Sequence, residues 1–122
     1  MDFQLSDEQE MLRDTTRDLL AHNYDAERRN KFIDTDLGWS REVWSQLADT
    51  GILGLGFDPE ESGQIEIMLV LTELGRRLAP EPVLHAALGP GLVIAEAGPD
   101  EHQQLLGGVA EGRLVWAFAH FD

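Results

Sequence analysis

The spacing of apolar positions predicts helices along most of the chain. Ser6 followed by Gln9 is a capping-box pattern, so the first helix should begin at about residue 7. Apolar and small side chains then recur every three or four positions, while charged residues fall on the opposite face. This stripe consists of Met11, Leu12, Thr15, Thr16, Leu19 and Leu20. The pattern predicts an amphipathic helix that packs on one side.

Two further helices are predicted before residue 51. A short charged helix should run from Asp25 to about Ile33, where turn-forming residues end it. Ser40 can cap the next helix, and Trp39 and Trp44 stand where the two members of a hydrophobic staple belong. Gly51 occupies the position of a left-handed carboxy-terminal cap.

The second half of the chain is more apolar. Glycines interrupt residues 51–63, which predicts an extended loop. Residues 65–78 are apolar nearly all round, which predicts a helix at the centre of the bundle. Pro82 suits the start of another helix, with a kink expected near Pro90, and a short helix should follow Gly98 and end before Gly112.

The last segment has a different character. Residues from Leu114 to Phe121 are rich in aromatic and branched side chains and predict a β-strand, but one strand cannot form a stable sheet. The expected fold class is therefore all-α, an orthogonal or up-down bundle of about six helices followed by the first strand of a missing β-domain. The expected domain boundaries are 1–112 for the helical domain and 113–122 for the truncated start of the β-domain.

Composition and charge narrow the class of partner. Hydrophobic residues make up 43% and charged residues 26% of the 122 residues, which is typical of a folded domain. Acidic residues outnumber basic ones 23 to 9, and the formal charge of -14 argues against nucleic acid or an anionic membrane surface as partner. No apolar run is long enough for membrane insertion. The acidic amino terminus does not resemble a secretory signal, so we expect a cytoplasmic protein.

Motif chemistry gives no active site. The chain has no cysteine, which excludes disulfides and thiolate metal ligands. Glu81 and His85 lie one helical turn apart, but a carboxylate-bridged metal site needs the motif on two helices plus further glutamates. The acidic turn at Asp34 and Asp36 lacks the glutamate that would complete a calcium loop. We therefore predict neither catalytic residues nor a metal site.

Five groups of short segments follow one another along the chain: Phe3-x-Leu5-Ser6-x-Glu8-Gln9-x-x-Leu12-Arg13, Trp44-x-x-Leu47-Ala48-x-x-Gly51-Ile52-Leu53-Gly54-Leu55, Glu73-Leu74-Gly75-Arg76 with Leu78-Ala79-Pro80-Glu81-Pro82, Ala97-Gly98 with Glu101-His102-Gln103 and Leu106, and Gly112-Arg113-Leu114 with Ala117-Phe118-Ala119-His120. The order of these segments resembles the amino-terminal domain of acyl-CoA dehydrogenases. No single segment is specific, but five of them in the right order cover nearly the whole chain. The nearest type is the small-subunit type, such as the small subunit of pimeloyl-CoA dehydrogenase. One departure is a short loop, because Ser62-Gly63-Gln64 leads directly into Ile65.

The resemblance implies a function for a parent enzyme. That enzyme would be an FAD-dependent oxidoreductase of fatty acid metabolism that removes an α-proton and a β-hydride from an acyl-CoA thioester. The resemblance places the base and most flavin contacts beyond residue 122, so the chain alone is expected to be inactive. The implied partners are the acyl-CoA substrate, an electron-transfer flavoprotein or similar acceptor, and the other subunits of a homotetramer or heterotetramer.

The resemblance also implies a substrate-pocket face on the helix that begins at Pro82. Pro82, His85, Ala86 and Gly89 follow at i, i+3, i+4 and i+7 and share one face. Ala86 and Gly89 would leave room for an acyl chain, and His85 would set a polar limit or hydrogen-bond a distal carboxylate or hydroxyl of the substrate. The competing interpretation is that this face packs on a neighbouring helix. At the level of the whole protein, a non-catalytic subunit or scaffold of a heteromeric dehydrogenase and a free-standing acidic interaction module remain alternatives.

Overall fold

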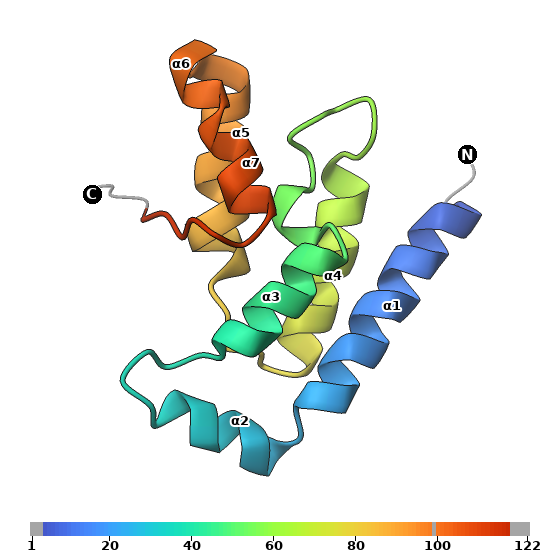
Figure 1. The fold of residues 1–122 in the computed structure, drawn as a ribbon. Helices are drawn as coiled ribbons and strands as arrows, with labels where there is room; N and C mark the ends of the chain where they lie inside the picture. Colours follow the sequence, from blue (N-terminus) through green and yellow to red (C-terminus); the bar gives the residue numbers. More distant parts are fainter. Residues whose placement is uncertain (1–3, 99, 118–122) are drawn as a thin grey trace, which may run out of the picture.

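The computed structural model describes residues 4–98 and 100–117, and within these ranges the chain is helical with no β-strand. The predicted all-α fold class is confirmed. Figure 1 shows α1 on one side of the molecule and α5, α6 and α7 on the other, with α3 and α4 between them in this view. The helices are α1 (Asp7–Asn23), α2 (Ala26–Ile33), α3 (Arg41–Asp49), the short 3₁₀ turn η1 (Ile52–Gly54), α4 (Gln64–Arg76), the π-helical turn η2 (Leu84–Leu88), α5 (Gly89–Ala97), α6 (Asp100–Gln103) and α7 (Leu105–Ala110).

Local capping signals explain where the first three helices begin. The Ser6 side chain accepts from the Gln9 N–H, and the Gln9 side chain accepts from the Ser6 N–H, which completes the predicted capping box of α1. The Asp25 side chain accepts from the Arg28 N–H and caps α2, and the Ser40 side chain accepts from the Val43 N–H and caps α3. The rings of Trp39 and Trp44 lie 5.1 Å apart between centroids, as the staple predicts.

The end of α3 and the following loop depend on one glycine. Gly51 has φ +81°, a left-handed conformation that costs a side-chain-bearing residue free energy. It turns the chain so that Ile52 and Leu53 enter the core completely buried. The predicted extended loop is therefore partly wrong, because its first residues form η1.

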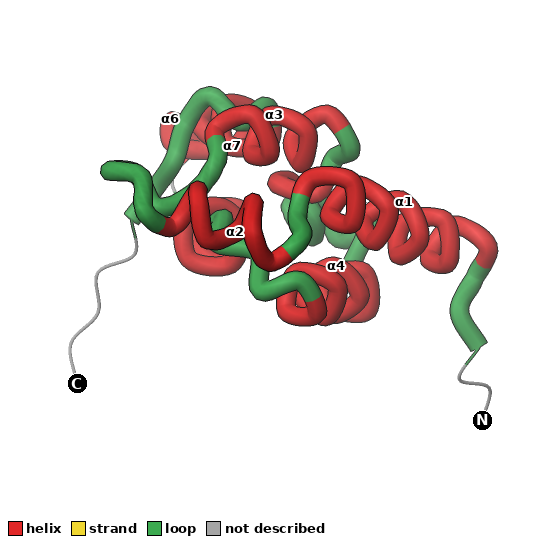
Figure 2. Tube along the Cα trace, turned by 90° about the horizontal axis from the view of Figure 1, so that it is seen from below, coloured by secondary structure: helices red, strands yellow, loops and turns green. Residues whose placement is uncertain are grey.

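The prediction that the helix at 65–78 lies at the centre of the bundle is wrong. Helix α4 packs beside α1, and Figure 2 shows it at the outer edge of the bundle when the molecule is seen from below. Ile67 and Val70 are buried, but the side chains of Ile65 and Met68 are 53% and 64% exposed. Apolar composition indicates how much surface a helix could bury, whereas the neighbours decide how much it does bury. The helix also ends earlier than predicted, at Arg76.

The carboxy-terminal part corrects two further predictions. The helix predicted after Gly98 is two pieces, α6 and α7, and it ends before Gly112, which has φ +80°. Residues 114–117 of the predicted strand are not a strand in the structure, and its remaining residues 118–121 lie outside the described ranges. The domain boundary after residue 112 stays a prediction.

The core lies where α1, α3, η1, α4, η2 and α7 meet. Each large apolar side chain that is fully buried there contributes roughly 1.5–3 kcal/mol relative to an exposed one. The completely or almost completely buried members are Leu20, Tyr24, Val43, Trp44, Leu47, Ile52, Leu53, Val70, Val83, Ala87, Leu88 and Val109. None of the described helices combines the length and apolar character needed to cross a bilayer.

Candidate functional site

The segment that begins at Pro82 changes its helical register before Pro90. Proline has no N–H, and its ring crowds the carbonyl four residues earlier, so a regular α-helix cannot continue through this position without adjustment. Leu84–Leu88 instead form a π-helical turn in which the Gly89 N–H donates to the Leu84 carbonyl. Helix α5 then begins at Gly89. The irregularity predicted near Pro90 is a π turn that ends at Leu88, two residues before the proline.

A distant segment satisfies the carbonyl that Pro90 leaves without an α-helical donor. The Trp116 N–H donates to the Ala86 oxygen at 3.0 Å, so Trp116 lies against the π turn, whereas the Leu114 N–H donates to the Gly108 carbonyl of α7. Buried carbonyls need a partner, and Trp116 supplies one here. The sequence signal was the proline alone, because nothing local marks the residue that replaces its donor.

The four predicted pocket residues differ in place and exposure, since Pro82 precedes the π turn, His85 and Ala86 lie within it, and Gly89 begins α5. Ala86 is buried, Pro82 and Gly89 are partly buried, and His85 is exposed. A Cβ atom at residue 89 would stand 2.8 Å from the Leu84 oxygen, closer than real Cβ contacts allow. The glycine at 89 is therefore a requirement of the π turn itself, independent of any ligand.

An apolar cavity lies next to this segment on other residues. It has a volume of about 290 Å³ and is bounded by α5, α6, α7 and the segment after α7. None of the four predicted residues lines it. In the sequence, only the i, i+3, i+4 spacing of Pro90, Val93 and Ile94 indicates that these three residues share one face of α5. The lining consists of Pro90, Val93, Ile94, His102, Leu105, Trp116 and Ala117.

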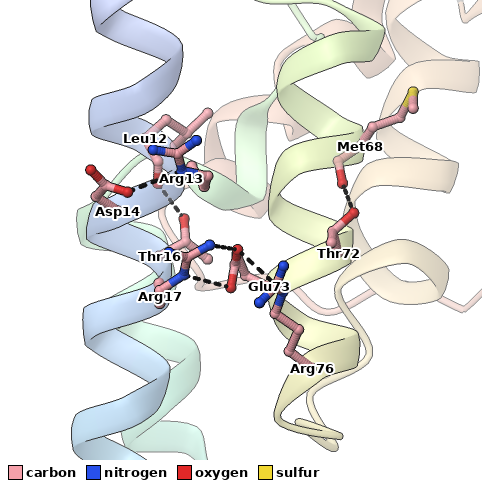
Figure 3. A network of polar contacts seen from close by, with 9 residues as sticks. All are labelled: Leu12, Arg13, Asp14, Thr16, Arg17, Met68, Thr72, Glu73 and Arg76. Carbon is pink, nitrogen blue, oxygen red and sulfur yellow. Dashed lines mark hydrogen bonds and ion pairs between the residues drawn. The ribbon is translucent and has the colours of Figure 1, made fainter. Parts of the chain in front are cut away.

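Glu73 is a buried carboxylate held by arginine side chains between α1 and α4. Figure 3 shows Arg17 reaching from α1 to both oxygens of Glu73, with Nη2–Oε1 2.8 Å and Nε–Oε2 3.3 Å. Arg76 approaches the same carboxylate at 3.7 Å, and Met68 points away from α1. The hydrogen bond from Arg17 lowers the pKa of Glu73, against the opposing effect of its burial. We call this set of Arg17, Glu73 and Arg76 the arginine clamp.

Glu81 is a second buried carboxylate, but its partners are neutral. The Tyr24 hydroxyl lies 2.8 Å from its Oε1 and 2.6 Å from its Oε2, and the Ser40 N–H donates to Oε2 at 2.9 Å. Burial raises the pKa of Glu81 despite these hydrogen bonds, and burial together with the carboxylate also raises the pKa of Tyr24. We call Tyr24, Ser40 and Glu81 the tyrosine brace.

The next question is whether the described residues bring possible metal ligands together. Across residues 4–98 and 100–117, no three histidine, aspartate or glutamate side chains gather as a metal site would require. His85 is exposed, whereas Glu81 is buried and committed to Tyr24 and Ser40. The spacing of Glu81 and His85 therefore does not bring them together as ligands.

Comparison with known proteins identifies the fold. A family model described as "Acyl-CoA dehydrogenase, N-terminal domain" matches residues 6–113. The chain is 29% identical over 116 residues to acyl-CoA dehydrogenase IpdE2 of Mycobacterium tuberculosis, covering 91% of this chain and 36% of that protein. It is 30% identical over 126 aligned positions to acyl-CoA dehydrogenase FadE12 of the same species, covering 93% of this chain and 30% of that protein. The chain thus spans about a third of the length of these relatives.

Two solved structures share the fold. The ChsE4-ChsE5 complex from Mycobacterium tuberculosis superposes with a TM-score of 0.85 at 24% identity, covering 96% of this chain and 34% of that one. A variant of the Tcur3481-Tcur3483 steroid ACAD superposes with a TM-score of 0.76 at 26% identity, covering 86% of this chain and 30% of that one. These structures share the fold, and the family match over residues 6–113 shows that the chain belongs to the acyl-CoA dehydrogenase N-terminal domain family.

Proposed function

We propose that this chain is the amino-terminal helical part of an acyl-CoA dehydrogenase that introduces a double bond between the α- and β-carbons of an acyl-CoA thioester. The observation that carries the proposal is the family match over residues 6–113, which spans nearly the whole chain. The proposed contribution of the chain is one wall of the acyl pocket and a surface for subunit packing. The predicted cytoplasmic location remains a prediction.

The proposed cofactor is FAD, which would accept the hydride from the β-carbon. The cavity beside α5 does not fit it, because its lining consists of apolar side chains with one imidazole and no lysine or arginine. A flavin dinucleotide needs donors for its pyrophosphate. We therefore propose that its contacts lie in other parts of the enzyme, and we assign no catalytic step to this chain.

The acyl-pocket wall is proposed to include Pro82, His85, Ala86 and Gly89. The exposure of His85 supports the proposal, since this side chain is available to a ligand. Ala86 and Gly89 add little volume beside it, which would leave space for an acyl chain. Gly89 is a poor position for a test because a side chain there would disturb the Leu84 carbonyl.

The test replaces His85 by tryptophan in the full-length protein. We expect KM for hexadecanoyl-CoA to rise about tenfold, in line with the cost of overpacking a site, while KM for butanoyl-CoA changes little. Leu84→Trp is the matched control, because Leu84 is its exposed neighbour in the chain and no pocket role is proposed for it. Equal effects on both substrates, or equal effects of the two substitutions, would remove His85 from the pocket.

A second candidate is a non-catalytic subunit of a heteromeric dehydrogenase. Both structural neighbours carry paired names, and one is described as a complex of ChsE4 with ChsE5. In this alternative the chain still packs in a mixed tetramer, but its partner supplies the base and the flavin site. Co-expression with candidate partner subunits, followed by flavin absorbance and activity of each subunit alone, distinguishes the two. An electron-transfer flavoprotein or similar acceptor is proposed in either case.

A further inference from the structure

The loop between α4 and the π turn makes hydrogen bonds with α2, with the end of α1 and with the start of α3. Arg29 of α2 donates from Nε to the Leu78 carbonyl at 2.6 Å, and Arg77 donates from Nη1 to the Tyr24 carbonyl at 3.3 Å. Leu78 itself has φ +50°, a left-handed conformation that is rare for a residue with a side chain. The surrounding contacts hold the loop in a conformation that leucine alone would not favour.

The tyrosine brace is the deepest of these attachments and the one closest to the proposed pocket. Glu81 directly precedes Pro82, and its side chain is only 5% exposed. Tyr24 stands at the end of α1, and its ring meets Phe32 of α2 edge to face at 5.9 Å. Ser40 is the cap of α3. One carboxylate therefore joins the end of α1 and the start of α3 to the first residue of the pocket segment.

We propose that Tyr24 is a positioning residue which, through Glu81, sets the entry angle of residues 82–89 and thereby the shape of the acyl pocket. The inference rests on the proposed function for the identity of the ligand, but not for the mechanical role of the brace. Tyr24 does not itself touch the substrate. Its hydroxyl holds the carboxylate, and the rigid Glu81-Pro82 junction passes that placement to the π turn.

The geometry of the brace supplies a conservative variant. In Glu81→Gln, an amide oxygen in the place of Oε2 can accept from both Tyr24 and Ser40, and the amide nitrogen in the place of Oε1 can donate to the Tyr24 oxygen. Tyr24→Phe keeps the ring against Phe32 but removes the hydroxyl donor. Glu73→Gln weakens the other buried carboxylate and serves as a control for a general loss of stability.

The experiment measures amide hydrogen exchange of residues 83–88 and the steady-state kinetics of the full-length protein in all three variants. Tyr24→Phe should accelerate exchange there roughly tenfold relative to the rest of the chain, as loss of a hydrogen bond to a charged group implies. It should raise KM for hexadecanoyl-CoA more than for butanoyl-CoA and leave kcat within about twofold, since positioning of the pocket affects binding more than chemistry. Glu81→Gln should behave like the wild type, and Glu73→Gln should show no selective change at residues 83–88.

The outcomes separate the two claims. If Tyr24→Phe leaves exchange at residues 83–88 unchanged, or accelerates it no more than in the rest of the chain, the positioning role is refuted whatever the activity. If exchange at residues 83–88 rises selectively but the wild-type protein oxidises neither hexadecanoyl-CoA nor butanoyl-CoA, the proposed function is refuted and the positioning role of Tyr24 is supported. Selective exchange together with the expected split in KM supports both.

Discussion

The arginine clamp and the tyrosine brace hold two carboxylates, each with almost no exposed surface, by opposite means. Glu73 is 3% exposed and Glu81 is 5% exposed, so both have lost nearly all contact with water. Glu73 receives two hydrogen bonds from Arg17, whose own side chain remains 44% exposed. Glu81 receives its hydrogen bonds from a phenol and a backbone amide, neither of which carries charge.

The pKa values of the two carboxylates shift in opposite directions because the carboxylates differ both in their partners and in how deeply they lie in the protein. An arginine beside a carboxylate favours the charged form, and the pKa of Glu73 is lowered. Neutral donors offset only part of the desolvation cost, and the pKa of Glu81 is raised. The clamp therefore stabilises the contact between α1 and α4 at neutral pH through charge. The brace fixes the position of the Glu81 side chain, although burial of this carboxylate is unfavourable for its charged form.

The largest expected effect comes from removing the hydroxyl of the brace. Tyr24→Phe takes the closest donor from a buried carboxylate and should lower the free energy of unfolding by about 2–3 kcal/mol. Chemical denaturation of the 122-residue chain at neutral pH measures it. A loss below about 0.5 kcal/mol, the size of an ordinary surface substitution, would show that the hydroxyl does not hold Glu81 in solution.

Substitutions at two glycines, one at the π turn and one in α4, test how tightly the backbone is packed in these two regions. Gly89→Ala should destabilise the chain by about 2 kcal/mol, because the new Cβ meets the Leu84 carbonyl of the π turn. Gly75→Ala in α4 should stabilise it by about 0.5–1 kcal/mol, because nothing lies within 4 Å and alanine favours the helix. Thermal unfolding of both variants gives the measurement. Changes of the same sign at the two glycines would argue against the tight π turn.

The sequence predicted those parts of the fold that depend on nearby residues. Ser6 with Gln9, Ser40 with Trp39 and Trp44, and Gly51 each act within one or two turns, so their patterns gave the helix boundaries. The prediction for α4 was wrong because its apolar residues do not indicate which elements pack around the helix. Ile65, for example, remains exposed.

The supports of the candidate site depend on residues far apart in the chain. Nothing near Pro90 indicates that Trp116 would bond to Ala86. The sequence interpretation weighed Glu81 only as half of a metal motif with His85, whereas the fold commits it to Tyr24 and Ser40. A glutamate between two prolines in an apolar stretch was the available sign that it would be buried. The four predicted pocket residues stay a prediction.

The smallest expected effect at neutral pH comes from neutralising each carboxylate without changing its shape. Glu73→Gln should cost about 1 kcal/mol, because its arginine partner is partly exposed and screened by solvent. Glu81→Gln should cost nothing, because the amide can keep the hydrogen bonds and removes a buried charge. A clear loss of stability in Glu81→Gln at neutral pH would indicate that the brace depends on the charge itself.

The pH dependence of these two variants tests the contrast most directly. A lowered pKa means that Glu73 contributes stability above the ordinary glutamate pKa of about 4.3 and loses it as the pH falls through the lower folded pKa. A raised pKa means that the contribution of Glu81 is complete below the ordinary value and is lost as the pH rises through the higher folded pKa. Urea denaturation of the wild type, Glu73→Gln and Glu81→Gln at a series of pH values from acid to neutral provides the comparison. The wild type should gain stability relative to Glu73→Gln as the pH rises and lose stability relative to Glu81→Gln over the same range. Slopes of the same sign for the two variants would contradict the account that the clamp and the brace hold their carboxylates by opposite means.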